Sequence, residues 1–306
     1  MKHFTDIKDL SNLDLKKIIA FTQKQKQLIK SKKVNEINKI LTNKNIGLFF
    51  EKPSTRTRVS FEVSINQLGG NCVQLKPEEL QISRGETISD TAKVLSRYLD
   101  GIIIRCFSHS LLIEFSQYST IPIINGLTNT SHPCQIIADL FTIQEYFGDK
   151  KRTKIAWLGD TNNVTKSWVD LAKISNIEFT ISSPKELLNS NLYIKEALKT
   201  HKNIKFEENP IKAVKSANVL TTDTWVSMGD KSVDKHNLLK PYQINKNLIK
   251  SASKEAVFMH CLPASRGKEV TSEVIDGKQS IVFDQAENRL HVQRSIINWC
   301  FEDDFK

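Results

Sequence analysis

Short apolar runs rich in β-branched residues alternate with amphipathic stretches along nearly the whole chain. This alternation narrows the fold more than any other feature, because strands separated by helices pair in parallel and carry helices on their faces. We expect strands at residues 46–50, 102–105, 121–125, 154–159, 177–182, 219–222, 257–260 and 280–283. The clearest helices are expected at residues 90–98, 135–146 and 166–175. The sequence therefore predicts an α/β protein built on parallel sheets.

The length of the chain favours two domains. Its 306 residues exceed the size of an ordinary single domain, and each half is long enough to bury a core. The polar, glycine-containing stretch at residues 148–152 precedes a new strand and is the expected boundary. In open parallel sheets, ligands bind outside the carboxyl ends of the strands. The side chains that follow the strands are therefore the candidates for a functional site.

The cysteine and charge content argue against several classes of protein. The five cysteines are widely spaced and form no CxxC pair, which favours reduced thiols in a cytoplasm over disulfides or a zinc site. No apolar run approaches the roughly 20 residues of a membrane span, and the N-terminal segment has no secretory h-region. The net charge of +10 comes from lysines spread along the chain, without the interleaved aromatics of a nucleic-acid-binding surface. We expect a cytoplasmic protein, with no membrane or nucleic-acid partner, whose basic surface helps anionic substrates approach.

The densest cluster of hydroxyl and basic side chains is EKPSTRTRVSFE, residues 51–62. It follows an expected strand and opens an amphipathic helix that Gly69 and Gly70 end. Arginine is unfavourable in the first turn of a helix because the helix dipole repels it, unless an anion lies there. The free backbone N–H groups at the helix start and the guanidinium groups together suit a phosphate group. An ordinary capped helix with a basic first turn is the alternative.

Two further candidates for an anion or carbonyl site lie at strand ends in the first half of the chain. Arg105 ends an apolar strand, and an arginine is rarely buried without a partner. An anion, a carbonyl oxygen or a surface salt bridge would satisfy it. His132 precedes Pro133, a residue suited to the first turn of a helix, and so is expected near the strand-end crevice. A lone histidine is usually a surface or capping residue, so the assignment of His132 to a site depends on its neighbours.

Three expected strands in the second half of the chain end on residues suited to an amino acid substrate. Asn163 follows one of them in a turn without the GxGxxG spacing of a dinucleotide site, and its amide both donates and accepts hydrogen bonds. A role in the turn alone is equally consistent with the sequence. Asp223 follows another strand and carries the charge that binds an ammonium group. Cys261 follows a third, where it is either a reactive thiol or a buried structural one.

Four of these segments together resemble the aspartate/ornithine carbamoyltransferase family. STRTR at residues 54–58 and HPCQ at residues 132–135 match motifs of the whole family. DTWVSMG at residues 223–229 and HCLPA at residues 260–264 are similar to its ornithine branch, the ornithine carbamoyltransferases. The similarity extends through nearly the whole chain, including residues 284–289. It implies an α/β fold of two doubly wound parallel-sheet domains joined by two interdomain helices.

The resemblance also implies domain limits and an assembly. The carbamoyl-phosphate-binding domain is expected at residues 1–147, with the C-terminal helix 290–306 packed back on it. The ornithine-binding domain is expected at residues 148–289. Members of the family are typically homotrimers with active sites between subunits. A loop around Gln81 of the neighbouring subunit is expected to complete the phosphate pocket.

The site residues of the family carry over onto matching positions of this chain. Carbamoyl phosphate is expected to contact Ser54, Thr55, Arg56, Thr57, Gln81, Arg105, His132, Gln135, Cys261, Leu262 and Arg289. Ornithine is expected to contact Asn163, Asp223, Ser227 and Met228. The residues expected to take part in the chemistry are Cys261, Arg105, His132 and Asp223. The chain departs from many relatives at Thr161 and Lys166, which affects the expected detail of the ornithine head-group site.

The implied reaction transfers the carbamoyl group of carbamoyl phosphate to the δ-amine of L-ornithine, giving L-citrulline and phosphate. No metal or organic cofactor is expected, because carbamoyl phosphate is already activated. The expected pathway is arginine biosynthesis, with arginine breakdown as the alternative. Aspartate as acceptor would require a cation where the chain has Asp223, and putrescine would leave Asn163 little to bind. A non-catalytic binding protein with this fold and a nucleic-acid-binding module are alternatives of other classes.

Overall fold

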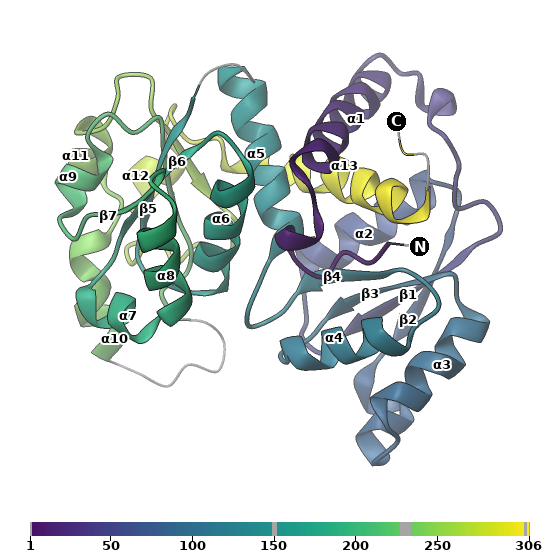
Figure 1. Ribbon diagram of the computed structural model, residues 1–306. Coiled ribbons are helices and arrows are strands. Elements are labelled where there is room, and N and C mark those ends of the chain that lie inside the picture. The colour runs from purple at the N-terminus through teal and green to yellow at the C-terminus, as the bar shows by residue number, and fades with distance from the viewer. Residues whose placement is uncertain (1, 149–151, 227–233, 303–304, 306) are drawn as a thin grey trace. The chain divides into compact units, whose positions relative to one another are not determined.

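The computed structural model describes residues 2–148, 152–226, 234–302 and 305. The chain divides into two compact units. Unit 1 comprises Met1–Phe141 and Glu287–Lys306, and unit 2 comprises Thr142–Ala286. In Figure 1, unit 1 contains the purple and blue parts of the chain and most of the yellow C-terminal helix, and unit 2 contains the green part. Each unit has its own parallel sheet and its own core.

Unit 1 is built around a four-stranded parallel sheet. Its strands lie in the order β2-β1-β3-β4, with the bounds β1 (Asn45–Phe50), β2 (Asn71–Leu75), β3 (Gly101–Arg105) and β4 (Ile123–Leu127). β1 and β3 are buried except at their ends, which explains their continuous apolar sequences. The chain adds β2 on one side of β1, and then β3 and β4 on the other side. A ligand crevice is expected at this reversal, where β1 ends at Phe50 and β3 ends at Arg105.

Unit 2 is built around a five-stranded parallel sheet. Its strands lie in the order β7-β6-β5-β8-β9, with the bounds β5 (Lys154–Leu158), β6 (Glu178–Ser182), β7 (Ile204–Phe206), β8 (Val219–Thr222) and β9 (Val257–His260). Here the chain adds β6 and β7 on one side of β5, and then β8 and β9 on the other side. The same rule therefore places a ligand crevice at the ends of these strands, beside Leu158 and Thr222.

The helices follow the strands in the βα order that the sequence predicts. Their bounds are α1 (Asn12–Lys30), α2 (Thr55–Gln67), α3 (Ile88–Tyr98), α4 (His109–Tyr118), α5 (Pro133–Phe147), α6 (Asn163–Ile174), α7 (Lys185–Ser190), α8 (Leu192–Thr200), α9 (Pro210–Val214), α10 (Asp234–Leu239), α11 (Lys246–Lys250), α12 (Ser272–Ile275) and α13 (Val282–Phe301). α5 and α13 each cross the division between the units, so the chain passes between units within a helix both times. In the described part of the chain, no helix combines the length and the apolar character that crossing a membrane requires.

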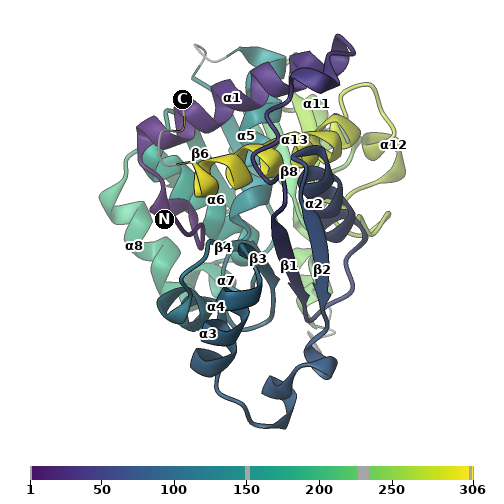
Figure 2. The same cartoon turned by 90° about the vertical axis from the view of Figure 1, so that its right-hand side faces the viewer.

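α13 returns the chain to unit 1, where it lies beside α1 and α2 (Figure 2). Polar side chains mediate part of this packing. The hydroxyl of Thr22 on α1 donates to the hydroxyl of Ser295, at 2.8 Å. Arg294 has no exposed surface and donates to the side-chain oxygen of Gln67 at the end of α2. Such buried polar groups stay in a core only when they have hydrogen-bond partners, so these pairs fix the position of α13 within unit 1.

The predicted α/β fold with two parallel sheets is confirmed, and the predicted strands 219–222 and 257–260 coincide with β8 and β9. The predicted strand 280–283 is wrong, because α13 begins at Val282. The backbone N–H of Gln285 donates to the oxygen of Ile281 at 2.9 Å, which is the hydrogen bond of a helix. β2 and β7 were not predicted. Both are edge strands, and polar residues such as Asn71, Gln74 and Lys205 interrupt their apolar pattern.

Candidate active site

The loop after β1 leads into α2, whose first turn carries the basic cluster. Ser54 is the N-cap of α2, and its hydroxyl oxygen accepts the backbone N–H of Thr57 at 3.2 Å. Thr55 is exposed and Arg56 half-buried at the start of the helix. The first backbone N–H groups of a helix have no partner within it, and the dipole adds positive potential. The predicted helix start at this segment is therefore confirmed, while its role in binding phosphate stays a prediction.

Thr57 lies at the meeting point of two arginines from distant parts of the chain. Its hydroxyl oxygen accepts a hydrogen bond from Arg105 at the end of β3 (3.0 Å) and another from Arg289 on α13 (2.7 Å). Thr57 and Arg289 are both buried, and Arg105 is half-buried. A hydroxyl oxygen accepts two hydrogen bonds, so these arginines occupy its acceptor capacity. The hydroxyl of Thr57 therefore donates its hydrogen to a third group.

His132 and Gln135 lie at the start of α5, where HPCQ was predicted to open a helix. Burial lowers the pKa of His132 well below its ordinary value, and the charges of Arg289 and Arg105 lower it further. The imidazole is therefore neutral at pH 7 and carries one N–H. The side chain of Gln135 is fully buried and donates through Nε2 to Asp139, at 2.7 Å.

Acidification should destabilise the protein through the buried histidines of unit 1. Burial is the largest cause that lowers the pKa of both His132 and His291. The unfolded chain takes up protons at these side chains below about pH 6.5 while the folded chain does not, so the free energy of unfolding should fall as the pH falls below that value. We expect a slope of up to about 1.4 kcal/mol per pH unit for each histidine, measured by urea unfolding from about pH 7.5 to pH 5.

The variant His291→Gln should show a smaller slope over the same range. Carboxylates with a lowered pKa, such as Asp14 and Glu287, act in the same direction but only below about pH 4.5, outside this window. A free energy of unfolding that is constant from pH 7.5 to about pH 5 would contradict the assignment of neutral, buried histidines.

In unit 2, a glycine permits close approach between the ends of β5 and β8. Gly159 follows β5 with a φ of +132°, a conformation that side chains other than glycine rarely adopt. A Cβ at this position would lie 3.2 Å from the hydroxyl oxygen of Thr222 and 3.2 Å from the indole nitrogen of Trp225. The turn that carries Asn162 and Asn163 therefore lies directly against the strand end that carries Asp223.

Asn162 connects the start of α6 to Asp223. Its Oδ1 accepts the backbone N–H groups of Val164 (3.0 Å) and Thr165 (3.1 Å), so it is the N-cap of the helix. Its Nδ2 donates to Oδ2 of Asp223 at 3.0 Å. Because the cap fixes the oxygen, the amide nitrogen can point only toward the carboxylate. Asn163, the predicted ligand, is the first residue of α6 and is half-buried.

Replacing Asn162 with serine should separate these two functions. Serine is also a good N-cap, so α6 and the melting temperature should change little. Asp223 loses one charge-assisted hydrogen bond, which is worth about 1.5–3 kcal/mol, and kcat/KM for the amino acid substrate should fall roughly 10- to 100-fold. Steady-state kinetics and thermal unfolding of Asn162→Ser measure both effects. An unchanged kcat/KM would mean that Asn162 acts only as a helix cap.

The thiol of Cys261 reaches the same carboxylate from the end of β9. Its Sγ lies 3.2 Å from Oδ1 of Asp223, as a donor. His260 also lies nearby, so a carboxylate, an imidazole and a thiol have ligand atoms within 4.8 Å of one another. These are donor types that Zn²⁺ accepts. However, Nδ1 of His260 accepts the backbone N–H of Leu262 (2.8 Å) and Nε2 lies 3.4 Å from Glu269, so the imidazole is already used to hold the strand end.

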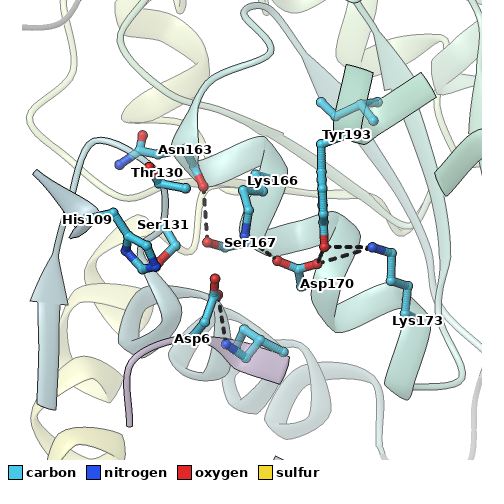
Figure 3. A network of polar contacts seen from close by, with 12 residues as sticks. Asp6, His109, Thr130, Ser131, Asn163, Lys166, Ser167, Asp170, Lys173 and Tyr193 are labelled. Atoms are coloured by element: carbon cyan, nitrogen blue, oxygen red, sulfur yellow. Dashed lines mark hydrogen bonds and ion pairs between the residues drawn. The ribbon is translucent and has the colours of Figure 1, made fainter. Parts of the chain in front are cut away.

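The helix that carries Asn163 is held by a network around Asp170 (Figure 3). Lys166 lies 2.8 Å from one oxygen of Asp170, and Lys173 lies 3.3 Å from the other. The hydroxyl of Tyr193 on α8 donates to the same buried carboxylate. Lys166 is therefore part of the packing of α6 against α8, where Asp170 pairs its charge.

The remaining predicted residues differ in what the structure says of them. Gln81 is exposed at the start of the 3₁₀-helix Gln81–Arg84. Leu262 is half-buried, with a φ of +56°, and the bond from Leu262 to Pro263 is cis. Ser227 and Met228 lie outside the described residues.

Two residues were missed by the sequence analysis: Asn162 and Asp139. Asn162 was passed over because its neighbour Asn163 matched the family, although an asparagine directly before a helix is a recognisable N-cap. Asp139 lies four residues after Gln135 on α5, and that spacing alone would have placed the two side chains on one face.

Two family models together match nearly the whole chain. The carbamoyl-phosphate-binding domain of aspartate/ornithine carbamoyltransferase matches residues 2–145. The aspartate/ornithine-binding domain of the same family matches residues 151–300. The two matches meet near the predicted boundary at residues 148–152.

Relatives and solved structures agree with these models. The ornithine carbamoyltransferase of Rhodopseudomonas palustris (strain BisA53) is 48% identical over 303 residues, covering 98% of this chain and 97% of the relative. That of Nitrobacter winogradskyi is 47% identical over 301 residues, with the same coverage. The structure of ornithine carbamoyltransferase from Pyrococcus furiosus matches with a TM-score of 0.88 at 39% identity, covering 97% of this chain and 96% of that one. The chain therefore belongs to the aspartate/ornithine carbamoyltransferase family.

Proposed function

We propose that this chain is an ornithine carbamoyltransferase, which forms L-citrulline and phosphate from carbamoyl phosphate and L-ornithine. The observation that carries the proposal is the placement of Arg105 and Arg289 on the hydroxyl oxygen of Thr57. This placement makes the buried Thr57 hydroxyl a hydrogen-bond donor with positive charge on both sides. A carbonyl oxygen requires such a donor as it becomes an oxyanion. Neutral His132 supplies a further N–H to the same oxygen.

The phosphate half of the substrate belongs, in this proposal, at the start of α2. The backbone N–H groups there and the side chains of Ser54, Thr55 and Arg56 bind the phosphate oxygens. Arg289 completes the positive surroundings of the carbamoyl group. These groups stay in place when the bond to phosphate breaks, so they also stabilise the leaving group.

Unit 2 supplies the groups for the amino acid. The δ-ammonium of ornithine has an ordinary pKa of roughly 10.4, so the amine must lose a proton before it attacks. Asp223 binds and orients this group, with the Cys261 thiol beside it. Asn163 binds the α-amino and α-carboxylate groups, together with Ser227 and Met228, and Leu262 completes the pocket.

The proposed step forms one bond and breaks one. The amine nitrogen attacks the carbonyl carbon, whose oxygen is stabilised by Thr57, Arg105 and His132. The carbon–oxygen bond to phosphate then breaks, and its electron pair leaves with the phosphate. The nitrogen loses two protons in all. The ammonium gives the first to water before the attack, and the second passes to Asp223 or to the departing phosphate once the new bond has formed. This chemistry uses the two substrates, water and side chains alone.

We also propose a homotrimer in which Gln81 of one subunit completes the phosphate pocket of its neighbour. The exposure of Gln81 and the exposed edge strand β2, where Val73 is 37% exposed, support a surface available for another subunit. Light scattering on the purified protein tests the assembly. A mass equal to one chain at the concentration used for activity assays would rule out the shared site.

The test of the reaction is product formation from carbamoyl phosphate with ornithine, putrescine, aspartate or N-acetylornithine as acceptor. We expect citrulline from ornithine and no product from the others. Turnover with a different acceptor alone would overturn the assignment of Asp223 and Asn163, and no turnover with any would overturn the proposed activity. We place the reaction in arginine biosynthesis in the cytoplasm. Restored growth without arginine, in cells lacking their own ornithine carbamoyltransferase, tests that role.

A further inference from the structure

Gln135 and Asp139 form a buried hydrogen-bonded pair on α5. They lie four residues apart on the helix, and both side chains are buried, with exposed fractions of 0% and 1%. Nε2 of Gln135 donates to Oδ1 of Asp139 at 2.7 Å. Within the described residues, Oε1 of Gln135 is buried and has no hydrogen-bond partner. A buried acceptor without a partner costs about 1–3 kcal/mol, so this atom requires a donor that the described residues do not supply.

The carboxylate determines which end of the amide faces away from it. Oδ1 of Asp139 accepts the hydrogen bond from the NH₂ group of Gln135, so the amide oxygen faces the opposite side. His132 directly precedes α5, three residues before Gln135. The charges of Arg289 and Arg105 act on that histidine, so the unpaired oxygen belongs to the region where the carbamoyl group is proposed to bind.

We propose that Asp139 is a positioning residue that fixes the orientation of the Gln135 amide and thereby selects an acyl phosphate bearing an N–H group. The inference rests on the proposed function and adds a reason why the site would select carbamoyl phosphate over acetyl phosphate. Carbamoyl phosphate and acetyl phosphate differ only in an NH₂ group against a methyl group. An amide oxygen fixed toward this group pairs with the NH₂ and remains unpaired beside the methyl. If the amide were free to turn, part of this discrimination would be lost.

The experiment compares the KM for carbamoyl phosphate with the inhibition constant of acetyl phosphate, at fixed ornithine concentration. The variant Asp139→Asn keeps the shape of the side chain but can either donate or accept, so the Gln135 amide can take both orientations. We expect the ratio of the two constants to shift toward acetyl phosphate by about tenfold, the value of one hydrogen bond. Asp100→Asn, a half-exposed carboxylate of the same unit, should leave the ratio unchanged.

A double-mutant cycle distinguishes positioning from a general structural effect. Gln135→Met removes the amide, so adding Asp139→Asn to it should change the ratio no further. If the effects of the two substitutions on the ratio add, Asp139 does not act through Gln135 and the inference is wrong. An unchanged ratio in Asp139→Asn alone also overturns it. Where Asp139→Asn does not fold, Asp139→Ser takes its place, since a hydroxyl also donates and accepts. Failure of the parent protein to form citrulline would instead reject the proposed function itself.

Discussion

Replacing Arg105 with alanine should lower kcat for citrulline formation by roughly 10²–10³-fold, the usual effect of removing one donor from an oxyanion site. The substitution removes a positive charge from the proposed carbonyl site and one of the two hydrogen bonds that hold the Thr57 hydroxyl oxygen. That hydroxyl then loses the constraint that directs its hydrogen outward. Steady-state rates at saturating carbamoyl phosphate and ornithine measure the effect. Thermal unfolding shows whether unit 1 still folds.

The matched control is Arg97→Ala, which removes an exposed arginine from α3 of the same unit. It should retain the activity of the parent protein, because general loss of one positive charge has little effect on a reaction at another site. If Arg105→Ala retained full kcat, the assignment of Arg105 to the carbonyl oxygen would be wrong.

The substitution Asp223→Asn should lower kcat/KM for ornithine by about 10²-fold or more. The amide cannot neutralise the δ-ammonium or accept its proton. It also keeps only one acceptor oxygen, whereas the native carboxylate accepts hydrogen bonds from both Asn162 and Cys261. Binding of carbamoyl phosphate should be unaffected, because the proposed phosphate groups lie in unit 1. Kinetics with ornithine varied, and equilibrium binding of carbamoyl phosphate alone, separate the two effects.

Asp276→Asn is the control for this second prediction. Asp276 is an exposed carboxylate of unit 2 that pairs with Arg266. Its removal should not alter kcat/KM for ornithine, since exposed ion pairs contribute little. Equal kinetics for Asp223→Asn and Asp276→Asn would remove Asp223 from the mechanism.

The sequence predicted the parts of the fold that have a strong local pattern. β8 and β9 were predicted with their observed bounds because both are short, buried runs that contain strand-forming residues such as valine, threonine and phenylalanine. β7 has only three residues, too few for a period to appear. No helix was predicted for residues 12–30, although Ser11 and Asp14 form a capping box at its start. The signal was present there and was not used.

For the site, the sequence predicted which residues follow strand ends but not which of them meet. Thr57 and Arg289 are separated by 232 residues, and Asn162 and Asp223 by 61. Contacts at such separations depend on the order of strands in the sheet and on side-chain directions, neither of which has a local pattern. The contact of Asn162 with Asp223 was missed for this reason. Asp139 was missed although its spacing of four residues from Gln135 is a local signal.

The chain enters unit 2 within α5 and leaves it within α13, and this order affects when each unit is complete during synthesis on the ribosome. Unit 2 is one continuous segment, Thr142–Ala286, whereas unit 1 is completed only by Glu287–Lys306. All of unit 2 is therefore translated before the part of α13 that bears Arg289 exists. A nascent chain can thus form the amino acid half of its site while Thr57 still lacks one of its two arginines. Competence to bind carbamoyl phosphate should appear last, only after residues beyond 286 have left the exit tunnel.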